Sequence, residues 1–189
     1  MREDSKFFPE HYASSAYGIS YETLYNKGYR GIIYDIDNTL VAHGAPANEK
    51  AKKLFAHLRR IGFKACLLSN NSKARVELFN RDIGLMAVCN AFKPSRKGFE
   101  KAMKLMGTTR ENTIMIGDQV FTDIYGANRA KVHNILVSPL DPNEVLMVKF
   151  KRAPERLVLR AYKRFHPEEF REGKGDHDGD GRDSGKKGH

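Results

Sequence analysis

Short apolar runs typical of buried strands alternate along the chain with segments whose apolar residues recur at helical spacing. The strand-like runs cover residues 31–37, 63–68, 86–89, 112–116 and 133–137. The helical segments cover residues 47–61, 73–82, 94–106 and 121–130. Gly62 is a stop signal after the first helical segment. This alternation predicts an α/β fold, a doubly wound parallel sheet with helices on both faces.

Polar side chains follow the predicted strands at the point where each strand ends. Asp35 and Asp37 close the first strand, Ser69 and Asn70 follow the second, and Asp118 follows a later one. The right-handed crossover rule brings the carboxyl ends of parallel strands to one edge of the sheet, where such sheets bind ligands. We therefore expect these side chains to share one site.

These residue types suit phosphoryl transfer, which needs an in-line nucleophile, neutralised phosphoryl charge and a proton for the leaving oxygen. Two carboxylates two residues apart on an extended strand end point to the same side. Asp35 is thus a candidate nucleophile and metal ligand, and Asp37 a candidate general acid and base. Ser69, with Asn70 beside it, is a candidate substrate-binding residue, and Lys93 would oppose the developing negative charge.

Hard oxygen ligands favour a magnesium cofactor at this edge. Asp35 and Asp118 offer carboxylate oxygens, and Mg2+ keeps several waters and accepts phosphate oxygens. Asp123 supplies a further acidic group that would support the metal ligands. Each residue alone has an ordinary explanation as a turn, a cap or a surface group. Their order at successive strand ends is the specific signal.

Four motifs in this order resemble those of the haloacid dehalogenase-like phosphatases. Residues 35–40, DIDNTL, resemble the first motif, DxDxT, and residues 67–70, LLSN, resemble the second. Lys93-Pro94 resembles the third motif, and Gly117-Asp118 followed by Thr122-Asp123 resembles the fourth. The four motifs fall within residues 31–137, so the resemblance spans the predicted sheet.

The resemblance implies a role for each motif residue. It implies that Asp35 is the nucleophile and that Asp37 is the acid and base, ligating the metal through its backbone carbonyl. It implies that Asp118 binds magnesium, that Lys93 clamps the phosphoryl group and that Asp123 is a supporting acidic residue. The aspartate at the second acidic position favours phosphatases over the dehalogenase branch.

A narrower resemblance, over roughly residues 7–165, is to the YqeG-type phosphatases of the cap-poor third subclass. It rests on the lead-in at residues 8–17, on GYRG at residues 28–31 and on the basic coda at residues 149–156. A looser similarity to the phosphatidylglycerophosphate phosphatases is the only ground for naming a lipid substrate.

The spacing of the motifs leaves no room for a cap domain. Asp35 and Ser69 are 34 positions apart, and one helix and one strand take up nearly all of that length. Ser69 and Lys93 are only 24 positions apart. An uncapped site suits a large or surface-bound phosphoester, or a site closed by another subunit, and small metabolites remain open as substrates.

Positive charge is unevenly distributed along the chain. The net charge is +10, and residues 166–189 carry −2, which leaves +12 for the rest. A basic body favours polyanionic partners, including an anionic membrane surface. We expect an N-terminal lead-in (1–30), a catalytic core (31–148), a basic amphipathic helix (149–165) and a disordered tail (166–189). That helix either lies on an anionic membrane or docks its apolar face on the core.

The sequence contains no apolar run long enough to span a membrane and no stretch that resembles a signal peptide. Cys66 and Cys89 lie among apolar residues, and we expect both to be free thiols in a reducing compartment. We therefore expect a cytoplasmic protein, which would be peripheral at a membrane if the basic helix binds lipid.

Other classes of protein compete with a phosphatase. A phospho-signalling receiver domain also clusters aspartates, but its phosphorylated aspartate normally follows the third strand. A catalytically silent scaffold with an anionic partner, nucleic acid or membrane, would usually have lost a motif carboxylate, and none is replaced here. The charge permits a nucleic-acid-binding module, yet the chain has no zinc spacing, helix-turn-helix or aromatic-rich RNA motif.

Overall fold

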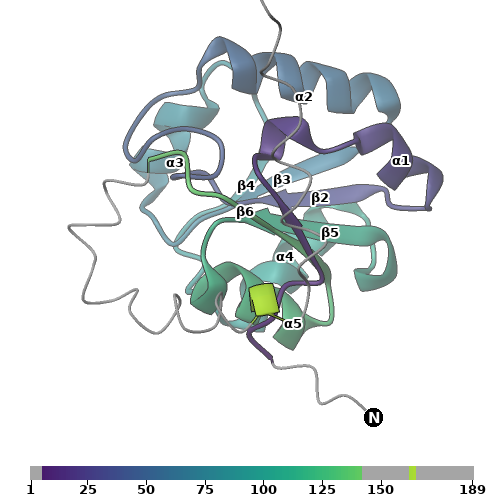
Figure 1. The fold of residues 1–189 in the computed structure, drawn as a ribbon. Helices are drawn as coiled ribbons and strands as arrows, with labels where there is room; N and C mark the ends of the chain where they lie inside the picture. Colours follow the sequence, from purple (N-terminus) through teal and green to yellow (C-terminus); the bar gives the residue numbers. More distant parts are fainter. Residues whose placement is uncertain (1–5, 142–161, 165–189) are drawn as a thin grey trace, which may run out of the picture.

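A computed structural model describes residues 6–141 and 162–164, which form a six-stranded, wholly parallel sheet with helices on both faces (Figure 1). The strands are β1 (His11–Ala13), β2 (Gly31–Tyr34), β3 (Lys64–Leu68), β4 (Met86–Val88), β5 (Thr113–Gly117) and β6 (His133–Val137). Their order across the sheet is β1-β6-β5-β2-β3-β4. The chain winds outward from β2 to β4, and then in the opposite direction from β5. This confirms the predicted doubly wound sheet.

The helices form one layer on each face of the sheet (Figure 1). They are α1 (Tyr21–Asn26), α2 (Glu49–Ile61), α3 (Lys73–Asn80), α4 (Arg96–Met106) and α5 (Tyr125–Ala130). Side chains alternate across a strand, so Ile32 and Tyr34 of β2 pack with α1, α2 and α3, whereas Ile33 packs with α4 and α5. A strand buried on both faces explains the continuous apolar run of β2.

The predicted strand over residues 31–37 is shorter in the structure and ends at Tyr34. Beyond it the chain turns, because Leu40 donates its backbone N–H to the Ile36 carbonyl (2.9 Å) and Asn38 adopts a left-handed φ of 63°. The expectation that Asp37 lies on the strand is therefore wrong, since it lies in this turn, whereas Asp35 directly follows β2 and its backbone N–H still donates to the Ile116 carbonyl of β5.

The predicted helix over residues 121–130 begins in a different form. Residues Val120–Ile124 make a π-helical segment, η3, which continues into α5. Single π-helical turns occur frequently at functional sites. This one carries Asp123, whose position therefore depends on a backbone feature that helical periodicity does not encode.

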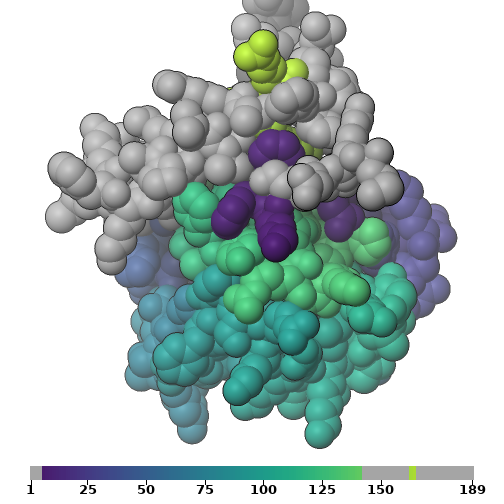
Figure 2. All heavy atoms as spheres, turned by 90° about the horizontal axis from the view of Figure 1, so that it is seen from below, coloured from purple at the N-terminus to yellow at the C-terminus, as the bar shows by residue number. Residues whose placement is uncertain are grey.

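The N-terminal residues belong to the same sheet, which the sequence did not predict. β1 pairs in parallel with β6, and Phe7 packs its ring against Phe121 and Tyr125, with centroid distances of 5.3 and 4.6 Å. In Figure 2 the purple N-terminal residues lie against the green surface of the later elements. A three-residue strand such as β1 is too short to show the alternation that identifies strands in sequence.

The predicted basic helix over residues 149–165 lies outside the described residues except for Tyr162, Lys163 and Arg164. Tyr162 is buried, and its ring stands edge-on to Phe8 at 5.7 Å, whereas Lys163 and Arg164 are exposed. Tyr162 of this segment therefore packs on Phe8, and the choice between docking and membrane binding for the rest of the segment stays a prediction. The expected disordered tail (166–189) lies outside the described residues.

Cys66 and Cys89 are both free thiols, as expected from the sequence. Within residues 6–141 and 162–164, none of the helices has the length and apolar character needed to cross a bilayer.

Candidate active site

The site lies at the carboxyl ends of β2 and β5, where the chain winds away in two directions. Ligands bind at such a switch point in doubly wound sheets. Asp35 directly follows β2, and its backbone N–H donates to the Ile116 carbonyl of β5 (3.0 Å). The strand pairing thus continues to Asp35 and fixes its backbone beside β5. The residue is 6% exposed, so its carboxylate is almost withdrawn from water.

Lys93 reaches this carboxylate from the loop between β4 and α4. Its Nζ donates to Asp35 Oδ1 (2.5 Å) and to Asp123 Oδ1 (2.7 Å), and its side chain is 3% exposed. Asn70, after β3, holds the Lys93 backbone from both sides: its Oδ1 accepts from the Lys93 N–H and its Nδ2 donates to the Lys93 carbonyl. The Asn70 amide, predicted to bind substrate, is thus used here to position Lys93.

Asp123 lies in η3, the π-helical segment that follows β5, and is fully buried. Its Oδ2 accepts a hydrogen bond from the Gln119 backbone N–H (3.1 Å). Gly117, the last residue of β5, makes this approach possible, because a Cβ there would lie 2.3 Å from Asp123 Oδ2. The glycine of the Gly-Asp motif therefore makes room for the carboxylate.

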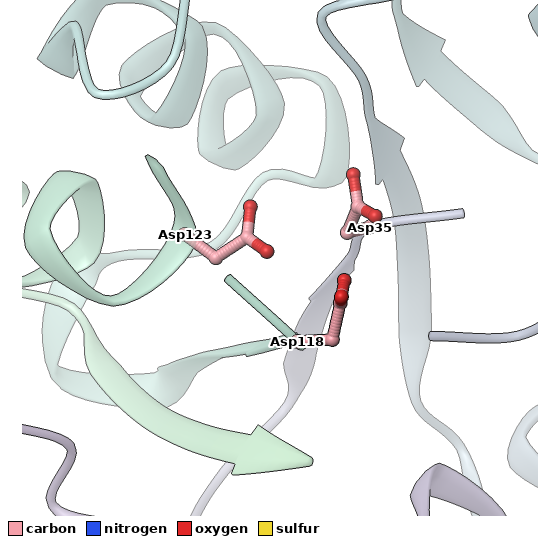
Figure 3. Close-up of side chains that lie close together, drawn as sticks. All are labelled: Asp35, Asp118 and Asp123. Carbon is pink, nitrogen blue, oxygen red and sulfur yellow. The ribbon is translucent and has the colours of Figure 1, made fainter. Parts of the chain in front are cut away.

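Asp35, Asp118 and Asp123 converge (Figure 3), and one oxygen of each lies within 4.8 Å of the others. Thr39 donates its hydroxyl to Asp118 Oδ1 (3.2 Å), which links the loop after β2 to the end of β5. Three buried carboxylates face one buried ammonium group, which leaves an excess of negative charge. A divalent cation with oxygen ligands would neutralise this excess, so the cluster fits magnesium.

Burial raises the pKa of Asp35 to about 7, while Lys93 opposes this shift and the negative charges of Asp123 and Asp37 add to it. Burial disfavours the charged form of Lys93, but Asp123 and Asp35 outweigh it and raise the pKa of the ammonium group. Lys93 is therefore held as a cation. A metal ion beside Asp35 would favour the ionised carboxylate, which a nucleophile requires.

Asp37 faces a different set of partners from Asp35. Its Oδ1 accepts from the Gly44 backbone N–H (2.9 Å) and from Arg75 Nη2 (2.7 Å) and Nε (3.2 Å), and its Oδ2 accepts from Asn71 Nδ2 (2.6 Å). The imidazole of His43, which is largely exposed, lies 3.9 Å from Oδ1. The Asp37 carboxylate is thus held by α3 and by the loop after β2.

The structure brings Asp35, Lys93, Asp118 and Asp123 into direct proximity. Ser69 is buried at the end of β3, where its hydroxyl accepts from the Asn71 backbone N–H (3.1 Å).

Two side chains, Asn71 and Arg75, hold the Asp37 carboxylate, and the sequence analysis assigned no role to either. Asn71 directly follows the second motif, and Arg75 lies three residues after Ser72, which caps α3. The positions of Asn71 and Arg75 after the second motif can be read from the sequence. Their contact with Asp37 cannot, because it depends on how α3 packs beside the loop that follows β2.

The family model described as haloacid dehalogenase-like hydrolase matches residues 41–131 of the chain. That range contains Ser69, Lys93, Asp118 and Asp123, whereas Asp35 lies just before it.

Two curated relatives are phosphatases by name. The chain is 36% identical over 159 residues to the probable phosphatase YqeG of Bacillus subtilis, a match that covers 84% of this chain and 92% of that protein. It is 28% identical over 157 residues to the chloroplastic/mitochondrial phosphatidylglycerophosphate phosphatase 1 of Arabidopsis thaliana, covering 77% of this chain and 45% of that protein. A crystal structure of a putative haloacid dehalogenase-like hydrolase from Bacteroides fragilis is 12% identical, with a TM-score of 0.46, and covers 59% of this chain and 98% of that one.

Proposed function

Because this chain belongs to the haloacid dehalogenase-like hydrolases and is a phosphatase of that family, we propose that it hydrolyses phosphomonoesters with Asp35 as nucleophile and Mg2+ as cofactor. The observation that carries this proposal is the buried cluster in which Lys93 bridges Asp35 and Asp123 beside Asp118. It combines a nucleophile, a fixed cation and a set of oxygen ligands.

The first half-reaction transfers the phosphoryl group to the protein. An Asp35 oxygen attacks phosphorus in line, the ester P–O bond breaks, and an aspartyl phosphate forms. Asp37 gives a proton to the departing alkoxide, so the leaving group is an alcohol. Lys93 holds positive charge against the phosphoryl oxygens, and the Ser69 hydroxyl donates a hydrogen bond to one of them.

The second half-reaction returns Asp35 to its starting form. Asp37, now a carboxylate, takes a proton from water, and the oxygen of that water attacks phosphorus. The bond between phosphorus and Asp35 breaks and inorganic phosphate leaves. When bound, Mg2+ supplies charge neutralisation for the phosphoryl oxygens, and Asp35, Asp118 and the Asp37 carbonyl would hold it.

Phosphatidylglycerophosphate is the substrate that the resemblance to the plant phosphatase suggests. The segment between β2 and α2 contains 14 residues, 35 to 48, which supports an uncapped site open to a large or surface-bound phosphoester. The positive charge of the chain would favour an anionic lipid surface, where the protein would be peripheral.

Phosphate release from a substrate panel tests this function. The panel contains p-nitrophenyl phosphate, sugar phosphates and phosphatidylglycerophosphate in vesicles, each with Mg2+ or with a chelator, for the wild type and Asp35→Asn. We expect release only by the wild type with Mg2+, and fastest release from the lipid. Release that survives Asp35→Asn would contradict the assigned nucleophile. No release from any panel member would favour a silent scaffold.

A further inference from the structure

One oxygen of the Asp37 carboxylate, Oδ1, is fully occupied in the structure. The carboxylate accepts four hydrogen bonds from N–H donors, three on Oδ1 and one on Oδ2. An ionised carboxylate has about two lone-pair sites on each oxygen, so Oδ1 has no acceptor position left, whereas Oδ2 keeps one. A general acid needs an oxygen free to point its O–H at the leaving group. Oδ1, the oxygen that Arg75 binds, therefore has to lose partners before it can serve the reaction proposed above.

Arg75 is the partner suited to exchange. Its side chain is 13% exposed, and it uses Nε and Nη2 on Asp37 while Nη1 is buried without a hydrogen-bond partner among the described residues. A buried donor without a partner is unfavourable, and an incoming anion would satisfy it. The planar guanidinium group binds carboxylates and phosphates through two parallel hydrogen bonds.

We propose that Arg75 recognises a second anionic group on the substrate, a carboxylate or phosphodiester next to the transferred phosphate, and thereby frees Oδ1 of Asp37 for proton transfer. This inference rests on the proposed phosphatase function. In the free protein Arg75 binds Asp37, and in the complex the second anion takes the place of Asp37 on the guanidinium group. Phosphomonoesters without such a group would leave Asp37 bound to Arg75 and react more slowly.

Matched substrates test this exchange directly. 3-Phosphoglycerate and glycerol 3-phosphate differ by a carboxylate in place of a neutral hydroxymethyl group, and glycerophosphoglycerol phosphate presents a phosphodiester instead. We expect Arg75→Met to lower the ratio of kcat/KM for the anionic over the neutral ester by about 10- to 100-fold, the range for losing a hydrogen bond to a charged group. This ratio is measured for the carboxylate ester and for the phosphodiester ester, and the one whose ratio falls more in Arg75→Met carries the anion that Arg75 recognises. Arg75→Lys should retain part of the ratio.

Lys73→Met is the matched control on α3, because that side chain is 79% exposed and forms an ion pair with Glu77, away from Asp37. We expect it to leave the ratio unchanged. The inference is overturned if the wild type does not prefer the anionic ester, or if Arg75→Met lowers kcat/KM equally for both esters. An equal loss would mean that Arg75 only positions Asp37.

Binding separates failure of this inference from failure of the proposed function. In the Asp35→Asn background, calorimetry with 3-phosphoglycerate and glycerol 3-phosphate should show tighter binding of the anionic ester, and the added Arg75→Met change should remove that difference. This result would support recognition by Arg75 even if the wild type released no phosphate. Equal affinities in both backgrounds would refute it.

Discussion

At the scale of residues, the site concentrates negative charge around one lysine. Asp35 and Asp123 both accept from Lys93, and Asp118 lies beside them. Removing ions from water is costly unless they are paired, so this arrangement is unfavourable for folding unless a cation completes it. The same excess of negative charge that destabilises the metal-free protein is what would bind a divalent metal, and the metal would in turn bind the phosphoryl oxygens.

The pH dependence of stability follows from Asp35. Burial raises its pKa from 3.8 to about 7, so the folded state holds this proton more tightly than the unfolded state. In a chelator, the unfolding free energy should therefore fall as pH rises from about 4 through 7. Asp35→Asn removes this loss. We expect the variant to gain about 3 kcal/mol over the wild type between pH 5 and pH 8, since the loss spans about two pH units below the folded pKa and each unit is worth about 1.4 kcal/mol.

Urea unfolding of both proteins at pH 5 and pH 8 measures this gain. Added Mg2+ should reduce it at pH 8, because the metal stabilises the folded wild type by binding to it. If the unfolding free energies of the wild type and Asp35→Asn differed by the same amount at pH 5 and at pH 8, the raised pKa of Asp35 would be contradicted.

Lys93→Met should lower both the unfolding free energy and kcat, which are measured independently. Asp35 and Asp123 would be left buried without their cation, which we expect to cost about 3–5 kcal/mol of unfolding free energy without metal. Loss of a charge-stabilising donor should lower kcat about 100-fold or more. Lys97→Met, at an exposed position on α4, is the control and should change stability by less than about 0.5 kcal/mol. Near-normal kcat in Lys93→Met would exclude Lys93 from the reaction.

At the scale of elements, the end of β5 and η3 fit together through Gly117. An alanine Cβ at this position would lie 2.3 Å from Asp123 Oδ2 and 2.5 Å from Asp123 Cγ, so the carboxylate has to move. We expect Gly117→Ala to lose about 1–3 kcal/mol of stability and to bind Mg2+ more weakly, because the ligand cluster is disturbed. Thermal unfolding in a Mg2+ titration, together with kcat, measures both effects.

Gly18→Ala is the control for this change, since no atom lies within 4 Å of its Cβ position. If Gly117→Ala retained normal Mg2+ affinity and activity, Asp123 would not need the position that the structure gives it.

Periodicity in the sequence predicted the interior elements better than the segments next to the site. α2 is confirmed with its stop at Gly62, because its apolar face is regular and Gly62 adopts the left-handed φ that ends a helix. β2 is shorter than predicted, because the chain turns after Asp35, where the Leu40 backbone N–H donates to the Ile36 carbonyl and Asn38 adopts a left-handed φ. The π-helical start of the Asp123 helix and the Arg75 contact depend on packing between elements, which a single sequence does not report.

At the scale of the whole molecule, segments far apart in the sequence pack against one another. Phe7 packs on Phe121 and Tyr125, and Tyr162 packs on Phe8. Motif order predicted that Asp35, Lys93 and Asp118 lie close together, because they follow strands whose order the crossover rule constrains. These terminal contacts have no such rule, so the sequence left docking and membrane binding of the C-terminal segment as alternatives.

Tyr162→Ala tests how strongly the C-terminal segment is docked. The side chain is 1% exposed, so its removal should lower the unfolding free energy by about 2–4 kcal/mol through lost burial. Arg164→Ala, at an exposed position in the same turn, should have little effect. Equal stability of Tyr162→Ala and the wild type in urea unfolding would show that this segment contributes little to the folded domain.

The central claim is that the phosphoryl group passes through Asp35, and trapping it there is the most direct test. Wild type and Asp35→Asn are mixed with a phosphomonoester and Mg2+, quenched in acid within one turnover, and analysed by peptide mass spectrometry. We predict a phosphoryl group on the wild-type peptide that contains Asp35 and none on the variant. Turnover by the wild type with no phosphoryl group at Asp35, or with one on another residue, would contradict the account.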